Sequence, residues 1–345
     1  MANIYSLDEW FNNIDESDLS SEKKELRKRD VAIAFKNEVP VIIDIDHFAS
    51  LLGIKKGVLS NMIHAPNKFY REFSIPKKLG GSRKIETPHK SLLEVQRWII
   101  RYILSKFSIH DAAFAYVKKR NAILNAGNHI NSNEAFIIDL YNFFPANLAS
   151  KVRQIFSSVG YNKDISFFLT NLCCLNGSIP QGAASSPIIS NILFFDLDRK
   201  LTEASNSLNI KYSRYADDLA FSGESISKDF KKDVYSIIED GGFLVNQDKI
   251  RQYVDGQPKI VTGIVVGSKL RLPKKKRRLI KQQVHYILKY GVLNNIKRYN
   301  DLFYIDRVLG KLNFWRQVEP DNPYVTKSIS QIKSMFSEVL KKERG

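Results

Sequence analysis

Three short apolar runs near the middle of the chain predict strands that lie beside acidic residues. Residues 135–140 form the first run, and residues 210–215 and 219–222 form the other two. The last two runs flank the adjacent acids Asp217 and Asp218. Short β-prone segments on both sides of a tight connection predict a hairpin, so both carboxylates are expected at its turn.

The segments around these strands carry apolar residues at helical spacing. Residues 91–107, 146–176, 188–201 and 228–240 are predicted helices, and residues 243–249 are a predicted strand. The resulting order of strand, helix and strand-turn-strand is the split β-α-β pattern. An α+β fold is therefore expected.

The first 70 residues are predicted to be mostly helical and separable from the rest. Within them, residues 45–63 have the rhythm of a helix-turn-helix, with Asp46 as N-cap and Gly53 at the turn. A DNA-reading motif would have this rhythm, and so would a helical pair packed against the main body. The second interpretation is the simpler one.

Residues 71–88 predict a second hairpin, with a Gly-Gly turn and four cations around it. Cations at the tip of a small hairpin suit a triphosphate, with arginine acting as a fork and lysine as a point charge. An exposed basic turn is the alternative. The four cations are Lys77, Lys78, Arg83 and Lys84.

Charge favours a polyanionic partner. The formal net charge is +17, and the chain from Asp248 onward holds 22 Lys and Arg against 8 Asp and Glu. A phosphate backbone suits such a surface. No apolar run approaches a membrane span and no signal peptide begins the chain, so a cytoplasmic protein without membrane association is expected. Cys173 and Cys174 are the only cysteines, which excludes a disulfide framework and a cysteine-based zinc site.

The two acids at 217 and 218 repel each other unless a cation neutralises them, and carboxylate oxygens suit Mg²⁺. A third carboxylate has two candidates, because Asp44 and Asp139 each follow two isoleucines. Asp196 and Asp198 are poor candidates, since positions i and i+2 of a helix do not share a face.

Three motifs in order resemble those of reverse transcriptases. They are residues 137–144 around Asp139, residues 180–187 around Gln181, and residues 215–218. The resemblance covers about residues 73–318 and implies a right-hand polymerase. The implied parts are an N-terminal helical extension (1–70), interleaved fingers and palm (71–255), and a basic, helical thumb that binds RNA (256–345). Asp44 precedes the basic hairpin, so the resemblance selects Asp139 as the third acid.

Within that class the chain resembles bacterial retron reverse transcriptases. Such enzymes copy part of a companion structured non-coding RNA into branched multicopy single-stranded DNA, starting from a guanosine 2′-hydroxyl. They commonly act with an effector protein in phage defence. Another bacterial reverse transcriptase class, or a non-catalytic RNA-binding scaffold, is the alternative. The residues that carry the retron resemblance are Asn125, Ala126 and His129, and then Val261, Thr262 and Gly263.

The resemblance also implies roles at the site. Asp139 and Asp217 would bridge two Mg²⁺ ions, with Asp218 as a weaker ligand and the Leu140 carbonyl beside one metal. For the incoming dNTP, Arg83 with Lys77 or Lys78 would hold phosphates, Phe144 would exclude a ribose 2′-hydroxyl, and Gln181 would contact the sugar and template. Lys249 would protonate leaving pyrophosphate or contact the backbone. The nucleic-acid duplex and the RNA would lie on Lys274, Lys275, Lys276, Arg277 and Arg278.

Overall fold

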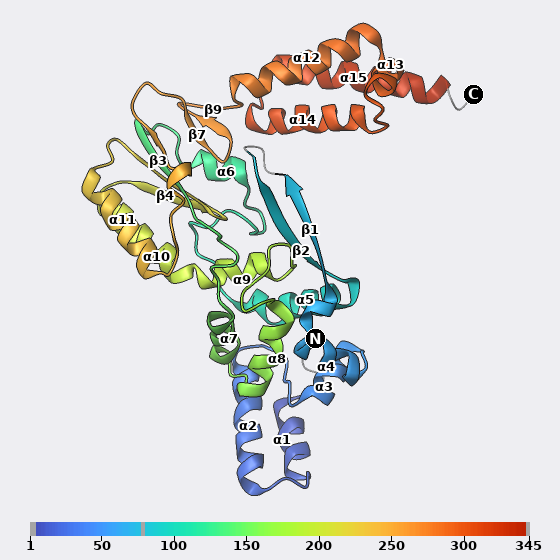
Figure 1. The fold of residues 1–345 in the computed structure, drawn as a ribbon, viewed down its shortest axis with the longest axis vertical. Helices are drawn as coiled ribbons and strands as arrows, with labels where there is room; N and C mark the ends of the chain where they lie inside the picture. The colour runs from blue at the N-terminus through green and yellow to red at the C-terminus, as the bar shows by residue number, and fades with distance from the viewer. Residues whose placement is uncertain (1–4, 77–79, 343–345) are drawn as a thin grey trace.

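The computed structural model describes residues 5–76 and 80–342 as an elongated molecule (Figure 1). The N-terminal helices lie at one end, a four-stranded sheet lies in the middle, and the last four helices form the other end. This arrangement confirms the α+β class and the split β-α-β order. The domain boundaries at residues 70 and 255 stay predictions.

The central sheet has the strand order β4-β5-β3-β6, and every neighbouring pair is antiparallel. Alternate side chains of β3 face opposite sides. Phe136 and Ile138 pack toward α10 and α11, whereas Ile137 packs toward α6 and the C-terminal helices. Both faces are therefore covered, and only the sheet ends remain open for chemistry. The bounds are β3 (Glu134–Asp139), β4 (Lys211–Tyr215), β5 (Asp218–Gly223), β6 (Arg251–Tyr253), α6 (Ala122–Gly127), α10 (Phe195–Asn206) and α11 (Lys228–Asp240).

The predicted basic hairpin forms from β1 (Tyr70–Pro76) and β2 (Ser82–Pro88), and the register pairs Pro76 with Ser82. The Glu86 amide donates to the Gln181 carbonyl at 2.9 Å, which ties β2 to the loop before α9. At Gly182, whose φ is +131°, an added Cβ would lie 2.8 Å from the Glu86 carbonyl oxygen. Only glycine permits this close approach. Lys77 and Lys78 lie outside the described residues.

The N-terminal helices are not separable. Their buried side chains share one core with α5, α7, α8 and α9, which corrects the expectation from sequence. Asp44, not Asp46, caps α3 by accepting from the His47 amide at 2.9 Å, and Gly53 ends that helix. The bounds are α1 (Leu7–Asp15), α2 (Ser21–Lys36), α3 (Ile45–Leu52), α4 (Lys56–His64), η1 (Pro66–Phe69), α5 (Lys90–Tyr102), η2 (Leu104–Lys106), α7 (Ala149–Ser158), α8 (Lys163–Cys173) and α9 (Ser186–Leu193).

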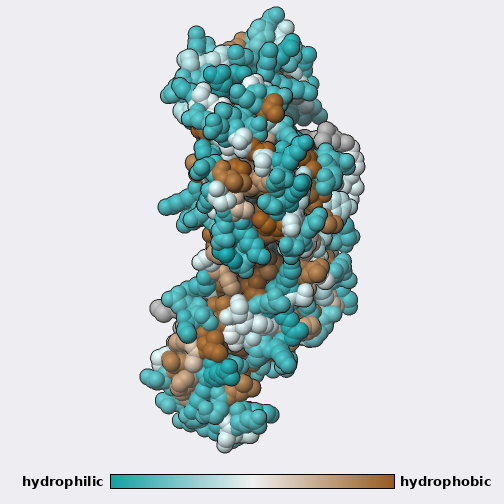
Figure 2. Space-filling model, turned by 90° about the vertical axis from the view of Figure 1, so that its left-hand side faces the viewer, coloured by the Kyte–Doolittle hydropathy of each residue, from teal (hydrophilic) through white to brown (hydrophobic). Residues whose placement is uncertain are grey.

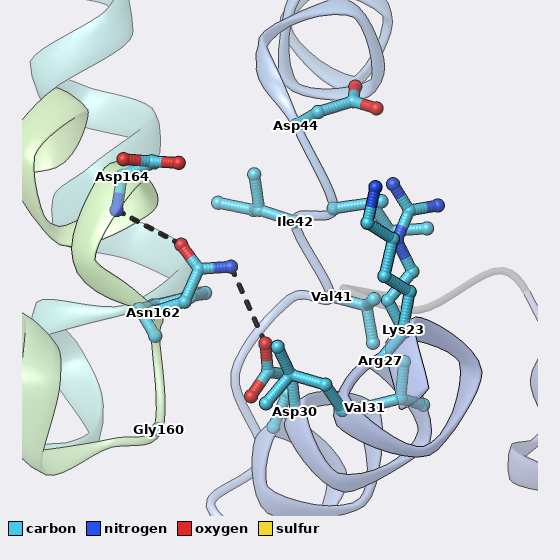
Figure 3. A pocket seen from close by; sticks show the side chains of 14 residues that line it. Lys23, Arg27, Asp30, Val31, Val41, Ile42, Asp44, Gly160, Asn162 and Asp164 are labelled. Atoms are coloured by element: carbon cyan, nitrogen blue, oxygen red, sulfur yellow. Dashed lines mark hydrogen bonds between the residues drawn. The ribbon is translucent and has the colours of Figure 1, made fainter. Parts of the chain in front are cut away.

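A cavity of about 360 Å³ lies where α2 meets the loop between α7 and α8 (Figure 3). Val31 and Ile42 line its apolar part, and Lys23 lies at its polar side. The Asn162 amide reaches across to the Asp30 carboxylate at 3.4 Å. Burial raises the pKa of Asp30, so this joint contains an acid that is only partly compensated.

The C-terminal region begins with a three-stranded sheet and continues as four helices that pack around the buried Trp315. Figure 2 shows mainly hydrophilic side chains over the end of the molecule where these helices lie. In the described chain no helix is both long and apolar enough to cross a membrane. The bounds are β7 (Lys259–Val261), β8 (Ile264–Val266), β9 (Leu270–Arg271), α12 (Lys274–Tyr290), α13 (Val292–Tyr299), α14 (Tyr304–Val318) and α15 (Pro323–Lys342).

Gly160 should be required where the N-terminal helices join the main body. Its φ is +99°, and an added Cβ would overlap the stiff side chain of Ile33. Gly160→Ala should therefore lower the free energy of unfolding by about 2 kcal/mol or more, measured by urea denaturation. Gly57→Ala in α4 is the control, because nothing lies within 4 Å of its added Cβ. Equal losses of unfolding free energy in Gly160→Ala and Gly57→Ala would contradict the close contact between Gly160 and Ile33.

Candidate active site

Three carboxylates meet at one end of the central sheet. Asp139 ends β3 and pairs in register with Asp218, the first residue of β5. Asp217 lies in the two-residue turn between β4 and β5, and its carbonyl accepts from the Leu140 amide at 3.0 Å. Ala216 has a φ of +58°, which lets the turn close tightly. The turn and the β3–β5 register together bring distant parts of the sequence to one place.

These acids are partly compensated by cations. The Lys249 ammonium lies 2.7 Å from Asp139 Oδ1, and the Asn246 amide donates to the same oxygen at 3.2 Å. Arg251 lies 3.6 Å from Asp218. The predicted strand before Lys249 does not form: one β-bridge joins Val245 to Leu140, and η3 (Gln247–Lys249) follows. This turn, η3, directs the Lys249 ammonium toward the Asp139 carboxylate.

Burial and neighbouring charge oppose ionisation of the paired acids. Burial first, and then the Asp139 charge, raise the pKa of Asp217. Burial and the Asp217 charge raise the pKa of Asp218 to about 6. The described residues hold no ready-made cluster of three metal-ligating side chains. Hard oxygen donors with unfavourable mutual repulsion nevertheless fit Mg²⁺, because a divalent cation would relieve that repulsion.

A cavity of about 570 Å³ opens beside these acids. Side chains from separate elements line it together. They are two of the acids, several cations, the Phe144 ring and the Gln181 amide, and all were expected from sequence. Asp218 and the basic start of α12 are not part of this lining. Lys84 is neutralised by Glu72 at 2.8 Å and Glu86 at 2.9 Å. The expected residues that line the cavity are Arg83, Lys84, Asp139, Leu140, Phe144, Gln181, Asp217 and Lys249.

A fully buried ion pair supports the acidic turn. The Arg214 guanidinium binds Asp198 through two hydrogen bonds of 2.9 and 2.6 Å, and both side chains are 0% exposed. Another Arg214 nitrogen donates to the Ala216 carbonyl at 3.3 Å. Asp198 is thus no metal ligand, as its helical position predicts. Its support of the turn was not predicted. Its place between Leu197 and Leu201 on a buried helix face was the available signal.

The sequence of this chain is similar to those of known polymerases. The family described as "Reverse transcriptase (RNA-dependent DNA polymerase)" matches residues 75–287. The chain belongs to the reverse transcriptase family. Retron Ec86 reverse transcriptase of Escherichia coli is 33% identical over 255 residues, which cover 72% of this chain and 79% of that relative. Retron Mx65 reverse transcriptase of Myxococcus xanthus is 28% identical, covering 72% and 64%. The chain is therefore a retron-type reverse transcriptase, an RNA-directed DNA polymerase.

His129 of this reverse transcriptase joins the two strands of the acidic hairpin, β4 and β5. It is 1% exposed, and its Nε2 and Nδ1 lie 2.7 Å from the hydroxyls of Ser213 in β4 and Ser222 in β5. Burial lowers its pKa to about 4, so the ring is neutral at pH 7. A neutral ring has one donor and one acceptor, which satisfy two hydroxyls without a buried charge.

The two segments that carry the retron resemblance touch each other. Thr262 donates its hydroxyl to the Ala122 carbonyl at 2.8 Å, at the start of the helix that holds Asn125 and Ala126. Lys276 in α12 donates to the Gly263 carbonyl at 3.3 Å. Val261 is buried in the same core as Ala126. These contacts, with those of His129, form a continuous path from the acidic hairpin to α12.

The structure adds site residues that sequence reasoning missed. Tyr116 and Asn246 line the cavity beside the acids. Tyr116 belongs to no motif recognised from sequence, whereas Asn246 was recognised only as the first residue of the Asn246-x-x-Lys249 motif and was given no role of its own. A signal existed for Asn246, which lies three residues before Lys249. For Tyr116 the sequence gives no such signal, because its place depends on a loop that long-range contacts hold.

His129 should make stability depend on pH in a defined window. Its pKa is about 4 when folded and 6.5 in an unfolded chain, so the unfolded state binds more protons between these values. The free energy of unfolding should fall by about 3 kcal/mol through this group as pH drops from 6.5 to 4. His129→Asn should remove that component in urea titrations. His285→Asn, on the exposed face of α12, should keep it. Identical pH slopes in wild type and His129→Asn would rule the assignment out.

Proposed function

We propose that this reverse transcriptase adds deoxynucleotides to a primer hydroxyl in the cavity beside Asp139 and Asp217. The observation that carries the proposal is the meeting of these acids with Arg83 and Phe144 around one cavity. Asp139 and Asp217 would hold two Mg²⁺ ions, with Asp218 as the weaker ligand and the Leu140 carbonyl nearby. When bound, such ions activate the attacking oxygen and neutralise the leaving one.

The chain's own side chains would orient the nucleotide. Arg83 faces the cavity, so its guanidinium is available to grip the β and γ phosphates, together with Lys77 or Lys78. Gln181 would contact the sugar and the template. Lys249 already lies 2.7 Å from Asp139, which supports a place near the reacting phosphates. Its proton could pass to departing pyrophosphate, or its charge could hold the phosphate backbone.

Phe144 would select deoxyribose by volume. Its ring packs on Phe143 at 5.4 Å between centroids and borders the same cavity as the acids. Such a ring leaves no room for a ribose 2′-hydroxyl beside the reacting phosphate. Selection by shape needs no hydrogen bond and tolerates all four bases.

The partner and product are proposed from the retron relatives. We infer that the template is a cognate structured non-coding RNA, that priming from a guanosine 2′-hydroxyl yields branched multicopy single-stranded DNA, and that an effector protein completes a cytoplasmic anti-phage system. The first turn of α12 carries the basic run from Lys274 to Arg278, most of it exposed. It would hold RNA or duplex phosphates, and binding would weaken as salt rises.

Phe144→Ala should increase use of ribonucleotides relative to deoxynucleotides by about tenfold or more, because the barrier to the 2′-hydroxyl is removed. Phe144→Tyr keeps the ring and should keep the selectivity. Primer extension with each nucleotide type, in Mg²⁺, measures the ratio. Unchanged selectivity in Phe144→Ala would refute the assignment of this ring.

Purification of the enzyme with its own RNA from cells tests the retron proposal. Sequencing should find one structured RNA joined through a 2′,5′ branch to single-stranded DNA. Asp217→Asn should retain the RNA and lack the DNA, because it loses a metal ligand but no RNA contact. Linear DNA without a branch would indicate another reverse transcriptase class. RNA without DNA in the wild type, and no extension of dNTPs in Mg²⁺, would indicate a binding scaffold.

A further inference from the structure

Tyr116 is held in an unfavourable backbone conformation beside the catalytic cavity. Its φ is +62°, in the left-handed region that bulky residues rarely adopt, and 54% of the residue is exposed. Such a conformation is unfavourable and persists only where surrounding contacts determine it.

Contacts on both sides fix the loop that carries Tyr116. Arg120 donates to the carbonyls of His110 and Ala113, each at 2.8 Å. It also binds the Asp111 carboxylate at 2.6 Å. The side-chain amide of Asn191 donates to the Ala115 carbonyl at 2.9 Å, directly before the tyrosine. The loop is therefore braced by its own residues and by α9.

The same loop is fastened to the strand that leads into the acidic turn. The Arg214 amide donates to the Ala112 carbonyl at 2.7 Å, and the Phe114 amide donates to the Arg214 carbonyl at 2.8 Å. Because the Arg214 side chain also binds the Ala216 carbonyl, one residue positions both the loop and the turn. Tyr116 thus has a fixed place relative to Asp217.

The ring of Tyr116 lies among groups that surround the proposed nucleotide. Its centroid is 6.4 Å from that of Phe144, with 49° between the ring planes, and both rings line the 570 Å³ cavity. Burial, and then the charge of Asp217, raise the pKa of the Tyr116 phenol, while Arg83 lowers it. The Tyr116 phenol therefore lies close enough to Asp217 and Arg83 for their charges to act on it.

We propose that Tyr116 packs its ring against the sugar and base of the incoming nucleotide and, with Phe144, determines how the nucleotide fits. The inference rests on the proposed nucleotide site. The incoming nucleotide is favoured over the template because the neighbours of Tyr116 are the groups assigned to its phosphates, metals and sugar. An exposed aromatic ring can stack on any of the four bases, because every base has a π-face.

Two substitutions distinguish the contribution of the Tyr116 ring from that of the loop backbone. Tyr116→Gly removes the ring and relieves the left-handed strain, so the thermal midpoint should stay the same or rise. It should raise KM for dNTPs by about tenfold, with a smaller change in kcat. Tyr116→Phe keeps the ring and should keep the wild-type KM. Lys119→Gly is the matched control, because Lys119 is exposed in the same loop with a φ of +65° and does not line the cavity.

Steady-state primer extension and primer–template binding, measured on the full-length chain, decide the outcome. An unchanged KM in Tyr116→Gly overturns the inference, and so does an effect confined to primer–template Kd. If Phe144→Ala still gains ribonucleotide use, the nucleotide site stands and only the role of Tyr116 falls. If neither variant changes nucleotide use, the proposed site itself is wrong. A raised KM in Lys119→Gly equal to that of Tyr116→Gly would assign the effect to the loop and overturn the role of the ring.

Discussion

The acidic end of the central sheet depends on one buried ion pair, Arg214 with Asp198. Two charges without solvent are stable only when geometry and hydrogen bonding are nearly complete, and removing one partner of such a pair typically costs about 3–5 kcal/mol. Here the guanidinium forms a fork with the carboxylate, lies 4.3 Å from the centre of the Phe194 ring, and reaches the carbonyl of Ala216. Helix α10, strand β4 and the acidic turn are thereby held as one unit.

The Arg214–Asp198 ion pair keeps Asp217 and Asp218 in positions where their ionised forms are unfavourable. Asp217 and Asp218 are less easily ionised than free carboxylates, since burial raises the pKa of both, the Asp139 charge raises that of Asp217, and the Asp217 charge raises that of Asp218. A loose hairpin would move them apart and relieve the repulsion. The buried pair below the turn and the neutral His129 behind it prevent that relaxation, so the repulsion persists and favours a bound cation.

Local patterns in the sequence were sufficient for β3, the acidic hairpin, the basic hairpin and the basic helix, because each depends on neighbouring residues, but the strand predicted at residues 243–249 does not form. Contacts between distant segments were not predictable in this way. The separability expected for residues 1–70 was wrong because their buried side chains share one core with α5, α7, α8 and α9. The roles of Arg214 and Tyr116 likewise arise from pairings across the chain. The Asp44 cap was missed because it resembled a strand-ending acid.

The shared core of the N-terminal helices has a consequence for synthesis on the ribosome. Asn37 and Pro40 find their partners Val159 and Tyr161 about 120 positions downstream. At roughly 5–20 residues per second, the first helices would wait on the order of ten seconds before those partners are made. During that interval Val31, Ala34 and Phe48 have no complete apolar surface to cover them. The nascent chain thus presents a transient target for chaperones until the rest of this core has been made.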